Sequence, residues 1–421
     1  MTDDSVLIVG QGYVGLPLAM RAVEVGFDVT GLDLDAAKVK RLNAGESYIE
    51  DITDDRLRAA LDSGRYRATA DIDEVSRFDV AVISVPTPLK EGIPDLRFME
   101  EAARALAPKV TTGATVVLES TTYPGTTDEL VGPILEAGSS LTAGVDFHLG
   151  YSPERIDPGN ATWTLENTPK VVSGTTPASL ERVQSFFDHI VETTVPVSST
   201  REAELTKLLE NTFRHVNIAL VNELAMFAND LGIDVWEAID AAATKPFGFM
   251  KFTPGPGVGG HCLPVDPSYL SWQVRRSLGT SFRFVELANE VNDHMPDYVV
   301  RRITTALNRE KKAVNGATVL LLGLAYKKNT GDARESPSRM ISAQLAGLGA
   351  DIWAVDPHVA ERDLPPDVTV AELDSSTVTQ ADIVVLLVDH DAFDAQVITS
   401  NGTPVLDCRR VLVASDTVEH L

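Results

Sequence analysis

Residues 5–15 read SVLIVGQGYVG, and this stretch decides the fold of the first part of the chain. The apolar run has the length of a strand, and Gly10, Gly12 and Gly15 match the pattern GxGxxG that leads from a strand into a helix. A helical pattern follows, and a second apolar strand ends in Asp33. Glycines and an acid also serve ordinary turns, but this order of strand, turn, helix, strand and acid predicts a dinucleotide-binding βαβ unit.

The glycine turn and Asp33 together favour NAD as the cofactor. The N-terminus of the helix that begins near Gly15 can point backbone amides at a pyrophosphate. A carboxylate at the end of the second strand can accept hydrogen bonds from ribose hydroxyls and would repel a 2′-phosphate, which disfavours NADP.

The apolar runs that follow continue this alternation. Strands are predicted over 80–85, 115–118 and 171–173, with helical stretches between them, as in a doubly wound parallel sheet. The pattern then changes, because residues 201–231 contain neither proline nor glycine and their apolar residues recur every three or four positions. This predicts one long helix that buries a stripe and stops at Gly232.

A second alternation begins at Ala317. Its predicted strands cover 318–323, 351–356, 383–388 and 404–407, and a helix is predicted over 340–348. The fold class is therefore predicted to be α/β, with two Rossmann-like doubly wound parallel-sheet domains joined by a long central helix and a helical middle domain. The predicted domains are 1–198, 199–305 and 306–421.

The charge of the chain limits its partners. With 36 basic and 61 acidic residues among 421, the formal net charge is −25. Such a charge would repel nucleic acid and anionic membrane surfaces, so neither is an expected partner. The lack of an apolar run of about 18 residues, together with an acidic N-terminus, predicts a soluble cytoplasmic protein. A halophilic surface is one interpretation of the scattered acids.

Cys262 lies in residues 255–266, GPGVGGHCLPVD, shortly after a run of glycines. Because glycine lacks the Cβ that would keep a substrate from the backbone, Cys262 is a candidate nucleophile. A small buried hydrophobe is an equal alternative on these residues alone. Two cysteines in a chain of this length argue against a disulfide framework, and neither Cys262 nor Cys408 has metal-ligand spacing with the eight histidines, so no metal site is expected.

Three loop residues allow both a functional and a structural interpretation. Thr87 and Thr121 follow strands, where their hydroxyls could face a cofactor, but turn chemistry explains them equally well. Glu154, in the sequence YSPER, is a carboxylate in a loop, and such a side chain is more often simply solvated.

The middle of the chain offers further polar candidates. Lys207 and Asn211 are four residues apart and share a helix face, although a solvated face is the commoner case. Asp266 before Pro267 is typical of a helix N-cap. Two lysines and an arginine follow the first strand of the last domain, in GLAYKK and DARESP, where they could hold a diphosphate.

Together these motifs resemble the UDP-glucose/GDP-mannose dehydrogenase family of NAD-dependent nucleotide-sugar 6-dehydrogenases. The ordered set runs through GQGYVG, SPER, KLLEN, NELA, GPGVGGHC, GLAYK, DARESP and LDCRR, and it spans nearly the whole chain. The resemblance implies an NAD-binding domain over 1–198, a central dimerisation domain with the cysteine loop over 199–305, and a UDP-sugar-binding domain over 306–421. It also implies a homodimer or a higher homo-oligomer formed through the central helix.

The resemblance implies a four-electron oxidation, in which the CH₂OH at C6 of a UDP-sugar becomes a carboxylate. Cys262 would trap the aldehyde as a thiohemiacetal that is oxidised to a thioester. Lys207 would stabilise the oxyanion with help from Asn211, and Asp266 would position a water. Glu154 would act on thioester hydrolysis.

Binding residues follow from the same resemblance. The implied NAD contacts are Gly10, Gly12, Gly15, Asp33, Lys38, Thr87, Thr121 and Arg334. The implied UDP-sugar contacts are Glu154, Arg155, Lys207, Asn211, Gly259, Lys327 and Arg409.

Departures from the family pattern narrow the substrate. UDP-glucose dehydrogenases commonly continue the loop after Pro-Glu with Phe-Leu and a second glutamate, whereas this chain reads RIDPG over 155–159. The arginine that many of them send across the dimer has no clear counterpart in TKPFGF at 244–249. Both features resemble the UDP-N-acetylhexosamine branch, with UDP-N-acetylglucosamine first and UDP-N-acetylmannosamine second. The alternatives are a UDP-glucose 6-dehydrogenase, a two-electron hydroxyacid-type dehydrogenase, and a non-catalytic nucleotide-sugar-binding protein.

Overall fold

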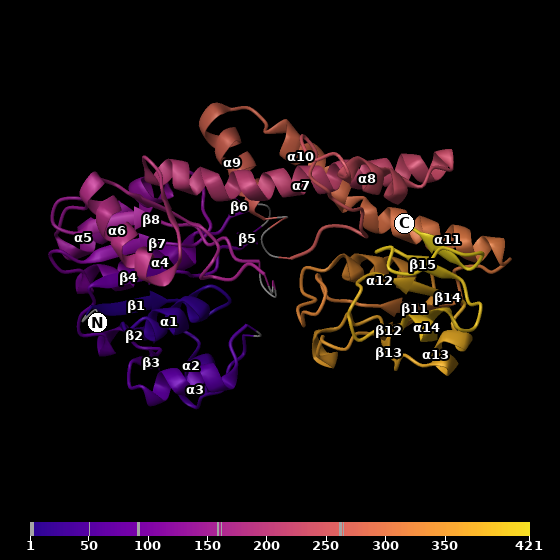
Figure 1. The fold of residues 1–421 in the computed structure, drawn as a ribbon, viewed down its shortest axis with the longest axis horizontal. Coiled ribbons are helices and arrows are strands. Elements are labelled where there is room, and N and C mark those ends of the chain that lie inside the picture. Colours follow the sequence, from indigo (N-terminus) through magenta and orange to yellow (C-terminus); the bar gives the residue numbers. More distant parts are fainter. Residues whose placement is uncertain are drawn as a thin grey trace. The chain divides into compact units, whose positions relative to one another are not determined.

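The computed structural model describes residues 4–49, 51–90, 93–157, 160, 162–260, 263 and 265–421. The chain forms two compact units, one of Met1–Glu210 with Ser268–Leu278 and one of Asn211–Pro267 with Gly279–Leu421. Figure 1 shows the elements of each unit along the sequence. Each unit has one large sheet.

The first unit contains an eight-stranded sheet in the order β3-β2-β1-β4-β7-β8-β9-β10. The strands are β1 (Ser5–Val9), β2 (Asp28–Leu32), β3 (Tyr66–Thr69), β4 (Val80–Ile83), β7 (Thr115–Leu118), β8 (His148–Tyr151), β9 (Lys170–Gly174) and β10 (Thr194–Pro196). The six strands from β3 to β8 are parallel, and Val6 of β1 pairs with Val29 on one side and Val80 on the other. A two-stranded antiparallel hairpin, β5 (Leu89–Lys90) and β6 (Ile93–Pro94), follows β4.

Helices cover both faces of this sheet. They are α1 (Gly15–Glu24), α2 (Ala36–Asn43), α3 (Asp54–Asp62), α4 (Arg97–Leu106), α5 (Gly132–Ser139) and α6 (Pro177–Ile190), with the short turns η1 (Ile72–Glu74), η2 (Ala107–Lys109) and η3 (Thr127–Val131). In β1, Val6 and Ile8 pack in one core cluster with α1 and α6, whereas Leu7 and Val9 pack in another with α4 and α5. Successive strand residues point to opposite faces, so a strand covered on both sides is apolar throughout.

The prediction that residues 171–173 extend the parallel sheet is wrong in direction. β9 pairs antiparallel with β8, with Tyr151 opposite Ser173. The connection between them has no helix among its described residues, whereas parallel neighbours need a crossover that is usually helical. That crossover comes one step later, where α6 joins the parallel strands β9 and β10.

The second unit repeats the layered arrangement. Its sheet has the order β13-β12-β11-β14-β15-β16, and these strands pair in parallel. The elements are β11 (Thr318–Leu322), α12 (Pro337–Gly347), β12 (Asp351–Val355), η4 (Glu361–Asp363), β13 (Thr369–Val370), α13 (Ser375–Gln380), β14 (Ile383–Leu386), α14 (Ala395–Thr399), β15 (Val405–Asp407) and β16 (Val418–His420). In β11, Val319 and Leu321 pack with α12, whereas Leu320 and Leu322 pack with α13 and α14. The predicted α/β fold class is thus confirmed, while the boundaries at 198 and 305 stay a prediction.

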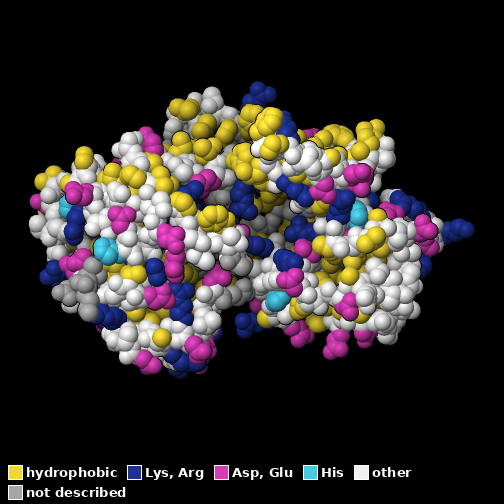
Figure 2. All heavy atoms as spheres, viewed as in Figure 1, with side chains coloured by type: hydrophobic (Ala, Val, Ile, Leu, Met, Phe, Trp, Pro, Cys, Tyr) yellow, Lys and Arg dark blue, Asp and Glu magenta, His cyan; other side chains and the backbone are white. Residues whose placement is uncertain are grey.

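The sequence between β10 of the first sheet and β11 of the second is largely helical. Its helices are α7 (Thr200–Leu231), α8 (Val235–Ala243), α9 (Asp266–Leu278), α10 (Arg283–Asp293) and α11 (Met295–Arg309). The long helix predicted over 201–231 is confirmed, and Gly232 stops it with φ +68°. Figure 2 shows hydrophobic side chains gathered over α10 and the C-terminal part of α7. No helix in the described ranges is long and apolar enough to span a bilayer.

Candidate functional site

A fixed backbone turn forms the predicted dinucleotide motif. Gly10 has φ +94°, which L side chains rarely adopt, and a Cβ there would lie 2.6 Å from the carbonyl oxygen of Ser84. A Cβ at Gly15 would lie 1.8 Å from the carbonyl oxygen of Gly10. Among the described residues, no heavy atom lies within 4 Å of a Cβ at Gly12. The outer glycines therefore hold the turn against the sheet and the middle one leaves the backbone open, as an NAD pyrophosphate requires.

Asp33 lies beside this turn. Its Oδ2 accepts the N–H of Gln11 at 3.0 Å and its Oδ1 accepts the N–H of Asp35 at 3.0 Å. A carboxylate has about four lone-pair positions, so some remain for ribose hydroxyls. The predicted NAD contact Lys38 lies in α2 with Nζ 5.7 Å from the ring centroid of Tyr48, whose hydroxyl donates to the Gln11 carbonyl.

The loops that carry Thr87 and Thr121 follow the neighbouring parallel strands β4 and β7. The Ser120 hydroxyl donates to the carbonyl oxygen of Val85 at 2.9 Å, which ties the two loops together. The carbonyl oxygen of Thr87 accepts the hydroxyl of Tyr269 at 2.9 Å. Both threonines are half-buried at the sheet edge where the glycine turn lies.

Glu154 belongs to a buried cluster of charges rather than to a solvated loop. Glu154 is 8% exposed, Lys170 at the start of β9 is 2% exposed, and Glu119 directly after β7 is 1% exposed. The Lys170 ammonium donates to Glu154 Oε2 at 2.8 Å and to Glu119 Oε1. Oε1 of Glu154 accepts the backbone N–H groups of Arg155 and Ile156 at 2.6 and 2.7 Å.

Sequence reasoning missed Lys170 and Glu119. Lys170 is the first residue of the fully buried strand β9, and Glu119 directly follows the fully buried strand β7, and a charged residue at such a position was the available signal. Burial raises the pKa of the Glu119 carboxyl, against the lowering effect of Lys170. Burial also opposes ionisation of Glu154, but the Lys170 charge and the hydrogen bonds to Glu154 outweigh it and lower the pKa.

Arg155 is oriented by α7. Its Nη2 and Nε bind the two carboxylate oxygens of Glu210 at 2.6 and 3.2 Å. Lys207 lies one turn earlier on the helix and is 9% exposed, and its ammonium has no hydrogen-bond or ion-pair partner among the described residues. A buried charge without a partner is costly, and an anionic group of a substrate would offset that cost.

Asn211 and Asp266 are in direct contact. The Asn211 side-chain amide donates to Asp266 Oδ2 at 2.6 Å. Asp266 is the first residue of α9 and is 2% exposed, so it faces this amide rather than solvent. Cys262 lies outside the described residues.

The glycine loop before Cys262 packs on the second unit's sheet edge. A Cβ at Gly259 would lie 2.7 Å from the carbonyl oxygen of Glu335 and 3.0 Å from Cβ of Tyr326. The Gly255 N–H donates to Asn222 Oδ1 at 2.9 Å. Gly259 is thereby close to the loop that carries Lys327, so two predicted UDP-sugar contacts lie near each other.

The two remaining arginines are both paired. Arg409 Nε lies 3.4 Å from Asp389 Oδ1, and its Nη1 would lie 2.9 Å from a Cβ at Gly255. Arg334 Nη2 binds Asp332 Oδ2 at 2.7 Å. Because Arg334 and the glycine turn belong to different units, its predicted contact with NAD stays a prediction.

Asp356, which ends the second strand of the second unit, is enclosed completely. Its two oxygens accept the N–H groups of Leu324, Ala325, His358 and Val359 at 2.6 to 3.0 Å. His390 Nε2 lies 3.1 Å from Asp356 Oδ2, while its Nδ1 accepts the N–H of Asn329. The imidazole proton is therefore on Nε2. Burial opposes ionisation, but these hydrogen bonds lower the pKa of Asp356 overall.

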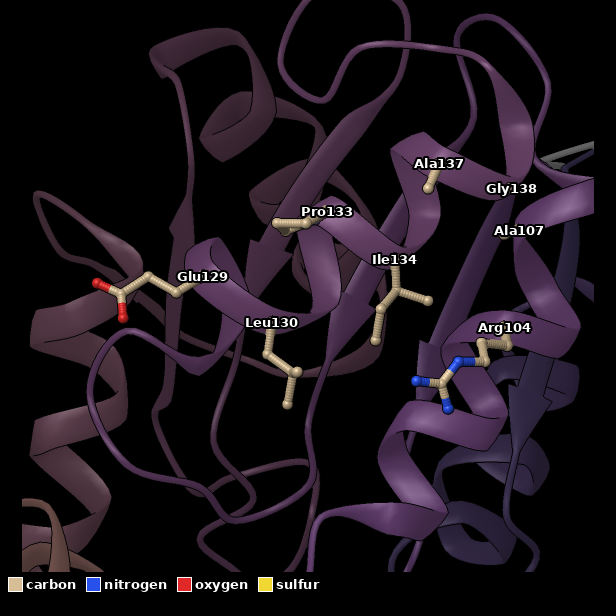
Figure 3. Close-up of a pocket in the computed structure, with 8 residues that line it drawn as sticks. All are labelled: Arg104, Ala107, Glu129, Leu130, Pro133, Ile134, Ala137 and Gly138. Atoms are coloured by element: carbon tan, nitrogen blue, oxygen red, sulfur yellow. The ribbon is translucent and has the colours of Figure 1, made fainter.

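A surface depression of about 470 Å³ in the first unit is separate from these residues. Figure 3 shows Leu130, Pro133 and Ile134 between Glu129 and Arg104. None of the predicted site residues lines it, and Glu129 and Arg104 are held in ion pairs with Arg201 and Glu100. We assign no function to it.

Three family descriptions match the chain in order. They are the UDP-glucose/GDP-mannose dehydrogenase family NAD binding domain over residues 4–191, its central domain over 201–294 and its UDP binding domain over 320–414.

Individual relatives agree with these matches. The UDP-N-acetyl-D-mannosamine dehydrogenase of Pyrococcus horikoshii is 34% identical over 92% of this chain and 90% of that protein. The UDP-N-acetyl-D-glucosamine 6-dehydrogenase of Pseudomonas aeruginosa is 36% identical over 93% and 92%. The solved structure of a UDP-D-ManNAc dehydrogenase from Pyrococcus horikoshii superposes with a TM-score of 0.88, at 31% identity over 99% of this chain and 98% of that one.

Proposed function

The chain belongs to the UDP-glucose/GDP-mannose dehydrogenase family and is an NAD-dependent nucleotide-sugar 6-dehydrogenase, and from this premise we propose that its substrate is a UDP-N-acetylhexosamine. UDP-N-acetylglucosamine is the first candidate and UDP-N-acetylmannosamine the second. Support comes from relatives named for these two sugars and from the loop RIDPG after Glu154.

We also propose that the oxidation proceeds through a thioester, and the hydrogen bond between Asn211 and Asp266 is the observation that supports this route. This hydrogen bond joins two predicted catalytic positions that are 55 residues apart, at 2.6 Å. Lys207 lies one helical turn before Asn211 on the same face of α7, and Cys262 lies four residues before Asp266. A nucleophile, an ammonium and a hydrogen-bonded carboxylate are the groups that the oxidation of an alcohol through a thioester requires.

The chain's own residues supply the acid–base and covalent chemistry. When bound, NAD takes up the hydrides that leave C6. The Cys262 thiolate adds to the C6 aldehyde, and the Lys207 ammonium stabilises the resulting oxyanion. Asp266, held by Asn211, positions a water for proton transfer. Glu154 promotes attack of water on the thioester, which releases the uronic acid and restores the thiol.

The other cysteine does not compete for this role. Cys408 is fully buried in the core of the second unit, and burial raises the pKa of its thiol. Replacement of Cys262 by serine distinguishes the enzymatic alternatives. A two-electron hydroxyacid-type dehydrogenase would be nearly indifferent to it, whereas the thioester route would lose overall turnover.

The decisive experiment is the number of NADH formed per sugar consumed. Purified protein is incubated with NAD and, separately, UDP-GlcNAc, UDP-ManNAc, UDP-GalNAc and UDP-glucose. Two NADH from an acetylated sugar are expected. A preference for UDP-glucose would reject the branch, one NADH per sugar would reject the thioester route, and binding without NADH would favour a non-catalytic protein.

The same proposal includes a homodimer or higher oligomer through α7. The helix exposes a stripe of large apolar side chains at helical spacing, formed by Leu205, Leu209, Phe213, Leu220, Leu224, Phe227 and Leu231. A second copy of the helix would bury this stripe. Sedimentation of the wild type and of Phe227→Glu tests it, because the charge should dissociate the oligomer and an unchanged mass would exclude this face.

A further inference from the structure

Lys170 holds Glu154 from inside the protein. The Lys170 ammonium lies between two carboxylates, 2.8 Å from Glu154 Oε2 and also bonded to Glu119 Oε1. Lys170 begins β9, Glu154 follows β8 and Glu119 follows β7, so the three side chains come from neighbouring strands of the sheet. The Lys170 side chain is 3% exposed, and the ring centroid of Phe187 lies 5.1 Å from Nζ. Water is thus largely kept from these charges, so their interactions are strong.

The Glu119 carboxyl is only half satisfied. Its Oε1 binds Lys170, but its Oε2 is buried without a hydrogen-bond partner among the described residues. A buried ionised carboxyl with an unpaired oxygen is costly, and protonation lowers this cost because it removes the charge. The cluster is then neutral, with a charged Lys170, an ionised Glu154 and a protonated Glu119.

We propose that Lys170 and Glu119 are positioning residues that set the orientation and the basicity of Glu154 in the water-consuming step. This inference rests on the role proposed above for Glu154. The Lys170 ammonium holds Oε2 of Glu154 and keeps the Glu154 carboxylate ionised. The same positive charge makes Glu154 a weak base. When Glu119 loses its proton, a second negative charge appears beside Glu154 and makes it a stronger base.

No other charged side chain is paired with Glu154 in the described part of the chain. Its neighbour Arg155 is turned towards Glu210, with Nη2 2.6 Å from Oε1. From α6 the apolar ring of Phe187 faces Lys170. Among the charged side chains of the described residues, Lys170 and Glu119 therefore set the basicity of Glu154, and the backbone N–H groups of Arg155 and Ile156 also lower its pKa.

The step itself is a hydrolysis in which no electrons are exchanged with an oxidant. Glu154 takes a proton from water as the water oxygen bonds to the thioester carbon. The carbon–sulfur bond breaks, and the sulfur of Cys262 leaves with the electron pair and receives the proton. The product is the uronic acid and the free thiol.

The test is the pH dependence of thioester hydrolysis in Lys170→Met and Glu119→Gln. Rapid mixing with NAD and the UDP-sugar that the wild type oxidises gives a burst of two NADH per site, and slow hydrolysis leaves the sugar acid on Cys262, visible by intact mass. Loss of the Lys170 charge should move the acidic limb of the hydrolysis rate to higher pH. Loss of the Glu119 charge should move it to lower pH and reduce the plateau about tenfold, because a weaker base remains.

Two further variants keep the test independent of folding. The double variant Lys170→Met/Glu119→Gln removes one potential charge of each sign, so it should fold if Lys170→Met alone does not, and its hydrolysis should stay slow. Glu204→Gln is the matched control, because Glu204 is also a fully buried carboxyl but bonds Gly125 and Thr127 instead. It should leave the limb in place.

The outcomes separate this inference from the proposed function. If the acidic limb of the hydrolysis rate does not move in Lys170→Met and Glu119→Gln, or moves in the same direction in both, the inference is overturned. The proposed function is unaffected in that case, because the wild type still turns over. A wild type that forms no NADH burst would overturn the proposed function, and the inference with it.

Discussion

Asp33 and Asp356 each directly follow the second strand of a βαβ unit, yet the protein uses them in different ways. Asp33 accepts two backbone N–H groups and stays half-exposed. Asp356 accepts four backbone N–H groups and the His390 imidazole, and its side chain is 0% exposed. Since a carboxylate has about four lone-pair positions, Asp356 has none left for a ribose, whereas Asp33 has.

Both βαβ units have a glycine after the first strand and an aspartate after the second. The difference between the two aspartates shows that this pattern alone does not make a dinucleotide-binding site. In the first domain Gly12 leaves open space over the backbone. In the sheet of the second unit only Gly323 occupies the turn, with φ +78°, and the following N–H groups of Leu324 and Ala325 turn inward to Asp356. Whether the aspartate can bind a ribose depends on how many of its carboxylate lone pairs already accept hydrogen bonds from the protein.

Asparagine at the two positions should expose the largest difference. We expect Asp356→Asn to lower the free energy of unfolding of its domain by about 3 kcal/mol, because several N–H groups lose a charged acceptor. We expect Asp33→Asn to cost about 1 kcal/mol or less in its own domain. Hydrogen exchange of the amides of β11 and β14, and of β1 and β4, across urea concentrations measures each domain separately. Equal losses would break the comparison.

Acid should act on the C-terminal, UDP binding domain through Asp356. The pKa of Asp356 is lowered in the folded state, so the stability it contributes is complete above its unfolded pKa of about 4 and is lost as the pH falls through that value towards the lower folded pKa. The domain should therefore lose stability from about pH 5 downwards, and Asp356→Asn should show a shallower loss. Unfolding in urea between about pH 3 and pH 7 measures both slopes, and parallel slopes would contradict the assignment.

Sequence reasoning was sufficient where periodicity decided the structure. The apolar strands and the glycine turn predicted both Rossmann-like domains, and the uninterrupted stretch 201–231 predicted α7. It was insufficient where a partner distant in sequence decided the environment. Glu154 was expected to be solvated on local grounds, but Lys170 and Glu119 reach it from neighbouring strands. The predicted parallel direction of β9 was wrong, because an apolar run does not indicate whether a strand runs parallel or antiparallel to its neighbour.

The cofactor should respond to Asp33 and not to Asp356. We expect Asp33→Asn to raise the KM for NAD about tenfold, equal to about 1.4 kcal/mol, and to lessen the discrimination against NADP, since the 2′-phosphate no longer meets a negative charge. Initial rates with varied NAD and NADP at saturating UDP-sugar measure both. Unchanged cofactor kinetics in Asp33→Asn would reject the ribose contact.

Salt should have the smallest effect on stability. It should distinguish exposed carboxylates, whose repulsion it screens, from buried ones. The net charge of −25 means that repulsion between exposed acids predominates, and at 0.1 M salt ions largely screen the repulsion between exposed charges more than about 10 Å apart. We expect the unfolding midpoint to rise by a few degrees with KCl. The stability difference between the wild type and Asp356→Asn should stay constant, because the Asp356 side chain is 0% exposed. Thermal unfolding of both proteins over a KCl series tests this. A midpoint that falls with salt would contradict the high-salt interpretation of the acidic surface, whereas a shrinking difference would mean that Asp356 is screened and therefore not sealed from water.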